Sequence, residues 1–173
     1  MKFTLVNKIS VSVALLGLVI LLAGCPYSSS VPIDQGSIKI PKSLVGKWVK
    51  SSDDQTENPT YFEISIDESN ASKATALKYE YSSSDSTYQS TRYQLTFSDV
   101  NGDMFMNAME DGGSTYSLFK FNFDESSGDV TTYEVSDYIK ETFSSSTELK
   151  GFIAKNKENS YFFTNTVDTY KKK

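Results

Sequence analysis

The chain of 173 residues contains no histidine and only one cysteine, Cys25. Without histidine it cannot build a catalytic site around an imidazole base, and one cysteine can form neither an internal disulfide nor a His/Cys metal centre. Positive charge is also scarce, because 17 Lys and Arg stand against 22 Asp and Glu and leave a net charge of −5. This balance argues against a nucleic-acid partner, and the length suits one domain.

The first 24 residues have the pattern of a targeting segment. Lys2 and Lys8 are their only charged residues, and an uncharged, mostly aliphatic run extends from Ile9 to Gly24. This run is shorter than the roughly 20 apolar residues of a membrane-spanning helix, and it ends in small residues. The pattern predicts a cleaved signal peptide over residues 1–24.

The segment ends in Leu22-Ala23-Gly24-Cys25, which resembles the lipobox of bacterial lipoproteins. The resemblance implies cleavage between Gly24 and Cys25, a diacylglycerol on the Cys25 thiol and, usually, an acylated amino group. Two or three acyl chains make a durable membrane anchor, whereas one gives only marginal binding. The alternative is an uncleaved signal anchor with an incidental cysteine.

The residue after Cys25 is Pro26, and not the aspartate that retains some bacterial lipoproteins in the inner membrane. The resemblance therefore implies the outer membrane, with the domain facing the periplasm; the cell surface is the alternative. Loss of Lys2 and Lys8 would leave 15 basic and 22 acidic residues. Anionic headgroups repel such a domain, so the lipid is expected to hold the protein at the membrane.

The stretch from Pro26 to Pro41 contains three prolines and a serine triplet but no amphipathic period. It predicts a flexible linker after the lipidated cysteine, over residues 25–41, that spans up to roughly 50 Å when extended. The folded domain is then expected over residues 42–173.

Beyond this linker, short segments of alternating apolar and polar residues follow one another between turn signals, which is typical of an antiparallel β-meander. Asn101-Gly102, between two apolar runs, predicts a tight hairpin. The expected strands are Tyr61–Asp67, Thr75–Tyr81, Tyr93–Phe97, Met104–Met109, Tyr116–Phe123, Val130–Val135 and Tyr161–Val167.

One helix is expected among the strands. Ser145 and Glu148 fit a capping box, and Leu149, Phe152 and Ile153 follow at helical spacing. The pattern as a whole predicts a mostly β fold: a single antiparallel meander of about eight strands, closed into a small barrel, with a helix before the last strand. A β-sandwich is the alternative.

The sequence Leu44-Val45-Gly46-Lys47-Trp48 resembles the Gly-x-Trp start of lipocalin-like barrels. The resemblance implies that Trp48 plugs the closed end of the barrel and that Gly46 permits a close backbone approach there. The order of meander, late helix and final strand is also similar to that of many small bacterial lipoproteins.

Aromatic residues at strand spacing are candidates for the lining of a cavity inside such a barrel. They are Tyr79, Tyr81, Tyr93, Phe105, Phe119, Phe121 and Phe123. Such residues more often form a filled core, because an eight-stranded barrel has an interior just large enough for side chains. A cavity would indicate a carrier of a small apolar ligand, and a filled core a module that recognises an envelope protein or a glycan.

Carboxylate pairs offer a catalytic alternative. Asp53-Asp54, Asp67-Glu68 and Asp124-Glu125 would suit a hydrolase if the fold brought two of them across a cleft. Each pair lies at a predicted turn or strand end, where carboxylates are usually solvated.

A second alternative is a calcium loop. Asp99, Asn101 and Asp103 alternate as oxygen ligands do in such a loop, and Glu110 stands at its twelfth position. The hairpin at Asn101-Gly102 explains the same residues without a metal. We therefore predict a non-enzymatic, membrane-anchored binding or interaction module with no metal and no cofactor beyond the lipid on Cys25.

Overall fold

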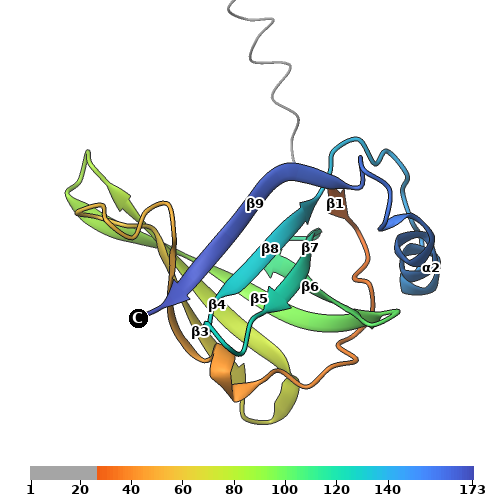
Figure 1. The fold of residues 1–173 in the computed structure, drawn as a ribbon, viewed down its shortest axis with the longest axis horizontal. Helices are drawn as coiled ribbons and strands as arrows, with labels where there is room; N and C mark the ends of the chain where they lie inside the picture. Colours follow the sequence, from red (N-terminus) through yellow and green to blue (C-terminus); the bar gives the residue numbers. More distant parts are fainter. Residues whose placement is uncertain (1–26) are drawn as a thin grey trace, which may run out of the picture.

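The computed structural model describes residues 27–173, so the predicted signal peptide and Cys25 lie outside the described residues. Eight antiparallel strands form a closed barrel (Figure 1). They are β2 (Gly46–Lys50), β3 (Tyr61–Asp67), β4 (Asn70–Ser82), β5 (Thr87–Val100), β6 (Asp103–Glu110), β7 (Tyr116–Phe123), β8 (Val130–Val135) and β9 (Phe163–Lys172). Each strand pairs with the next along the chain, and β9 also pairs with β2 and closes the barrel. This confirms the predicted meander over the sandwich.

The predicted hairpin at Asn101-Gly102 connects β5 to β6. Both residues have positive φ angles, 54° and 86°. These angles suit a tight turn whose twist matches the flanking strands, which is why Asn-Gly is favoured there.

The predicted helix is α2 (Ser146–Asn156), between β8 and β9. Ser145 accepts a hydrogen bond from the Glu148 amide at 3.3 Å, as a capping box requires. The Glu148 carboxylate reaches one residue further back than expected and accepts from the Ser144 amide at 3.2 Å. Within residues 27–173, none of the helices has the length and apolar character needed to cross a membrane.

The molecule has two hydrophobic cores, one inside the barrel and one between its outer wall and α2. Successive strand residues point to opposite faces, so Met106 of β6 packs with the inner core while its neighbour Phe105 is buried in the outer one. Leu149 and Ile153 of α2 fill the outer core from the other side. The helix is therefore held by docking on the sheet.

The segment from Tyr27 to Pro41 lies along the barrel instead of forming the predicted flexible linker. Its first residues form β1 (Ser28–Ser29), which pairs with the start of β7. Ile33 is 0% exposed, and its amide donates to Asn107 Oδ1 at 2.8 Å. Further along, the amide of Ile40 donates to the Ala71 carbonyl at 2.9 Å. The linker prediction is wrong for these residues because their apolar side chains fit separate sites on the barrel and show no period in sequence.

Strand β4 presents the opposite face to that expected from its sequence. The aromatic pattern assigns Thr75, Leu77, Tyr79 and Tyr81 to the inner face, whereas Ala74 and Ala76 are the buried residues and belong to the inner core. Ile64 of β3 pairs directly with Ala76, and residues opposite each other in a sheet share a face. The larger inward-facing side chains of β3 thus decide the orientation of β4, which places small side chains in the interior.

Candidate functional site

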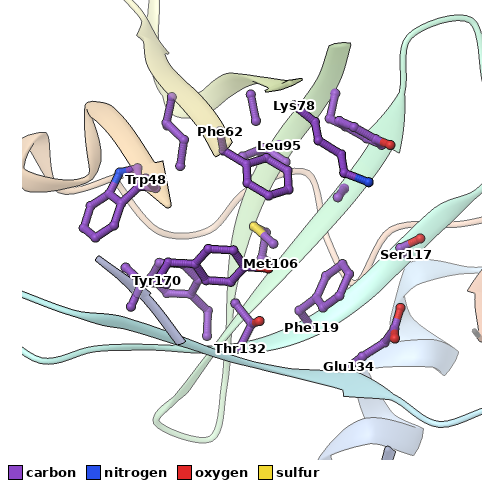
Figure 2. Close-up of a pocket in the computed structure, with 16 residues that line it drawn as sticks. Trp48, Phe62, Lys78, Leu95, Met106, Ser117, Phe119, Thr132, Glu134 and Tyr170 are labelled. Carbon is purple, nitrogen blue, oxygen red and sulfur yellow. The ribbon is translucent and has the colours of Figure 1, made fainter. Parts of the chain in front are cut away.

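The barrel interior is not filled and contains a cavity of about 420 Å³. This volume lies within the range of small-molecule sites. Sixteen residues line it (Figure 2): Trp48, Phe62, Ile64, Ala76, Lys78, Tyr93, Leu95, Met106, Ala108, Ser117, Phe119, Phe121, Val130, Thr132, Glu134 and Tyr170. Most are apolar or aromatic, so the cavity suits a ligand with an apolar body.

Trp48, which the resemblance to lipocalin-like barrels suggests as a plug, lies at one end of the cavity (Figure 2). Its side chain is 2% exposed, and its Nε1 donates to the Leu44 carbonyl at 2.8 Å. Leu44 ends the short 3-10 helix η1 (Lys42–Leu44), which precedes β2. Gly46 has a φ of +130°, and a Cβ there would lie 3.0 Å from Lys172 Cε. The positive φ favours glycine at the start of the strand that carries Trp48, whereas the flexible Lys172 side chain could move aside.

Polar side chains gather at the other end of the cavity, away from Trp48 (Figure 2). Lys78, Ser117 and Glu134 line the cavity there and are all partly exposed. The Lys78 ammonium pairs with Glu80 at 2.7 Å. We call Lys78, Ser117 and Glu134 the mouth of the cavity.

Glu134 brings a carboxylate into mainly apolar surroundings. Burial raises its pKa, and the negative charge of Asp168 raises it further. A cationic or hydroxyl group of a ligand would relieve both effects, because it would supply the hydrogen-bond donor or opposite charge that a carboxylate favours. Glu134 therefore marks where a polar end of a ligand fits.

Tyr170 lies in the middle of the cavity between the two ends (Figure 2). Burial raises its pKa strongly, and the charge of Asp168 adds to the rise. Its ring packs edge-on against Phe62, with centroids 5.7 Å apart. The phenol is thus neutral at physiological pH, and its hydroxyl is hydrogen-bonded to the Asp168 carboxylate, which contributes to the rise.

The aromatic residues singled out from the sequence have different positions in the structure. Tyr93, Phe119 and Phe121 line the cavity. Phe105 is fully buried in the outer core, on the other side of the barrel wall. Phe123 packs against the inner core but does not line the cavity.

Several lining residues were not among the sequence candidates. Phe62 and Ile64 carried a signal, because they alternate with polar residues in the predicted strand Tyr61–Asp67 and so share one face of it. Glu134 carried none: an isolated carboxylate in a strand is usually solvated, and only the closure of the barrel places it at the mouth of a cavity.

Tyr79 and Tyr81 lie on the outer face and belong to a cluster of four tyrosines. Tyr61 stacks on Tyr79 with centroids 4.6 Å apart, and Tyr88 packs edge-on against Tyr61 at 5.3 Å and Tyr81 at 5.5 Å. Lys47 Nζ lies 3.7 Å from the centroid of the Tyr61 ring. We call Tyr61, Tyr79, Tyr81 and Tyr88 the tyrosine cluster.

The carboxylates suggested for catalysis or calcium binding do not converge. Asp53-Asp54, Asp67-Glu68 and Asp124-Glu125 lie in or beside three separate turns. Asp103 instead forms ion pairs with Lys120 and Lys157. In the part of the chain that the structure describes, no three His, Cys, Asp or Glu side chains are grouped as metal ligands.

A closed eight-stranded meander, a Gly-x-Trp start and an internal apolar cavity together define a lipocalin-like β-barrel. Comparison of the chain with protein-family models, curated proteins and solved structures finds no match. The fold and the cavity are therefore the basis for assigning a function.

Proposed function

We propose that this protein is a lipid-anchored protein of the bacterial cell envelope whose barrel binds a small, mainly apolar ligand. The observation that carries the proposal is the cavity of about 420 Å³ behind Trp48, with its apolar walls and polar mouth. Sites for small molecules usually combine such walls with a few polar groups that fix orientation.

The distribution of polar groups supports an amphipathic ligand. Its apolar body would contact Phe62, Leu95, Met106 and Phe121, and each methylene transferred there from water contributes about 0.8 kcal/mol. Its polar end would meet Glu134 at the mouth. A hydrogen-bond donor, either an amine or a hydroxyl, suits this carboxylate best.

The role we propose is non-catalytic. Glu134 is the carboxylate of the cavity lining, and a carboxylate-based glycosidase needs two such groups facing one substrate. The acidic balance of the chain supports a partner other than a nucleic acid.

The membrane attachment rests on the lipobox-like sequence that ends in Cys25. We propose that Cys25 carries the lipid, that residues 1–24 are removed, and that the protein resides in the outer membrane with its barrel in the periplasm. Display on the cell surface is the alternative. A Cys25→Ser variant should stay unprocessed, and cell fractionation with mass spectrometry of the N-terminal peptide tests this.

Native mass spectrometry of the mature protein, extracted from the envelope in a mild detergent, tests the ligand. We expect a reproducible adduct that survives gentle activation. A bare mass in repeated preparations, together with no binding of long-chain amines or alcohols in a fluorescence titration of Trp48, would contradict the proposal.

A matched pair of variants separates binding in the cavity from adsorption to the surface. Ala108 lines the cavity, whereas Ala71 is exposed beside the β3–β4 turn. Ala108→Phe should abolish the adduct by filling the cavity, and Ala71→Phe should retain it. Equal loss or equal retention in both variants would place the ligand elsewhere.

The tyrosine cluster favours a second candidate function, recognition of an envelope glycan or protein. Tyr81 and Tyr88 are exposed on the hairpin between β4 and β5, which projects from the barrel (Figure 1). Aromatic faces give contact area at little cost in conformational entropy. A Tyr81→Ser/Tyr88→Ser double variant should lose a cross-linked envelope partner while it keeps the cavity ligand.

A further inference from the structure

The described chain begins beside the mouth of the cavity. Tyr27 is buried, and its hydroxyl donates to the Glu141 carbonyl at 3.1 Å. The next residue, Ser28, pairs across the sheet with Ser117, which is one of the three mouth residues. The first described residues are thus bound to the barrel at this point.

Covalent geometry places Cys25 close to the same point. Three residues separate Cys25 from Ser28 along the chain, and an extended chain covers at most about 3.6 Å per residue. Paired strands add about 5 Å. A lipid anchor on Cys25 therefore allows at most roughly 16 Å between the Cα atoms of Cys25 and Ser117, whatever path the connection takes.

Two exposed tyrosines lie just beyond the mouth. Tyr138 follows β8, the strand of Glu134, and is 74% exposed; Tyr161 precedes β9 and is 50% exposed. The Ser136 amide donates to the Phe162 carbonyl at 2.9 Å, so the two segments lie side by side. Tyrosine is enriched where proteins meet the headgroup region of a bilayer, because its ring is apolar and its hydroxyl is polar.

We propose that this end of the barrel rests on the bilayer to which Cys25 is attached, with Tyr138 and Tyr161 among the headgroups and the cavity mouth facing the lipid. The inference rests on the proposed lipid anchor. The bilayer is the partner of this surface, because the short connection from a lipidated Cys25 keeps the mouth close to the membrane. The ligand is then an amphiphile of that membrane, which exchanges between bilayer and barrel without crossing bulk water.

Spin labels at the two ends of the barrel test this orientation. The mature lipidated protein is reconstituted in vesicles of phosphatidylethanolamine and phosphatidylglycerol, with one new cysteine for the label. Tyr138→Cys reports on the mouth, and Glu125→Cys, in the exposed turn between β7 and β8, reports on the closed end. Collision rates with a water-soluble nickel chelate and with oxygen, which concentrates in the membrane, give the exposure of each label.

We expect the label at Tyr138→Cys to be several-fold less accessible to the nickel chelate than the label at Glu125→Cys, and more accessible to oxygen. Equal accessibility, or the reverse order, in a protein whose N-terminal peptide carries the lipid would overturn the orientation alone. An N-terminal peptide without lipid would overturn the anchor and the orientation together, so the two failures are distinguishable.

A longer connection provides the control for the tether. About twenty Gly and Ser residues inserted between Pro26 and Tyr27 add a coil of roughly 25 Å. The protection at Tyr138→Cys should then fall toward the value at Glu125→Cys. Protection that is unchanged by the spacer would overturn the role assigned to the short connection.

Discussion

At the scale of single residues, Trp48 lies at the end of the cavity opposite the mouth (Figure 2). It is almost fully buried, bonds to the Leu44 carbonyl and lines the cavity. Trp48→Ala should lower the free energy of unfolding by about 3–5 kcal/mol. Trp48→Phe should cost less, because a six-membered aromatic ring still fills part of the site, although the rest of the indole and its hydrogen bond, worth about 1 kcal/mol, are lost. Urea denaturation followed by far-UV circular dichroism checks both, and a loss below about 1 kcal/mol for Trp48→Ala would mean that it does not seal the barrel.

Glu134 makes stability depend on pH in a definite direction. Burial and the Asp168 charge raise its pKa in the folded protein above the ordinary value of 4.5. The folded state therefore binds the proton more tightly than the unfolded state, and stability falls as pH rises through the raised pKa. Glu134→Gln removes this dependence, so the variant should be more stable than the wild type at pH 7 and similar to it near pH 4.

The emission of Trp48, the only tryptophan, reports the urea midpoints for this comparison. Glu63→Gln, at an exposed position of β3, is the control and should match the wild type at both values. A Glu134→Gln variant that is less stable than the wild type at pH 7 would indicate that the carboxylate has a stabilising partner.

At the scale of elements, the segment from Tyr27 to Pro41 acts as a strap on the outer wall. A chain of polar groups holds it: Asn107 accepts from the Ile33 amide, Ser98 donates to Asp34 at 2.6 Å, and Lys150 of α2 pairs with Asp34 at 2.8 Å. Burial alone would raise the pKa of Asp34, but the hydrogen bonds from Lys150 and Ser98 hold it below its ordinary value. The strap thus connects the barrel to the helix.

Replacing Ile33 tests whether this strap contributes to stability. Ile33→Ala should cost about 2–5 kcal/mol, because it opens a void in the outer core. Lys39→Ala, at an exposed position of the same segment, should change stability by less than about 0.5 kcal/mol. Urea unfolding of both variants measures the difference, and a flexible linker would show no change for either.

The elements show what local patterns can predict. The bounds of β3, β7 and β8, the Asn101-Gly102 hairpin and the cap at Ser145 follow from alternation and turn chemistry, which depend on neighbouring residues. The orientation of β4 and the packing of the strap could not be predicted in this way. Both depend on residues of other elements that are distant in sequence, such as Ile64 and Asn107.

At the scale of the whole molecule, closure of the barrel depends on the last strand. Residues Tyr170 to Lys172 of β9 pair with Trp48 to Lys50 of β2, and Lys50 forms an ion pair with Asp168 at 2.7 Å. A chain ending after Thr169 loses the pairing between β2 and β9 and exposes the edges of both strands. We expect a loss of at least about 3 kcal/mol, since the ring of Tyr170 is removed as well, and association at high concentration.

Thermal denaturation and light scattering measure these effects of the truncation. Lys173→Ala is the control, because it removes one side chain and its ion pair with Asp54 but leaves the β2–β9 pairing intact. A truncated protein with the stability of the wild type would show that the β2–β9 pairing does not close the barrel in solution.

The sequence by itself excluded sites built on histidine or on several cysteines, because such residues are absent or single. It also determined the order of the strands, the late helix and the expected attachment at Cys25, because each of these depends on residues that are close together in the chain. Only the tertiary structure decided that the interior holds a cavity, that Glu134 lies at its mouth and that the segment from Tyr27 to Pro41 is bound to the wall. These features depend on the volume left when eight strands close, and on which side chains then meet across it. No local pattern contains that information. Ala76 and Ala108 leave space in the interior only because the side chains of the strands on the opposite side of the barrel do not fill it.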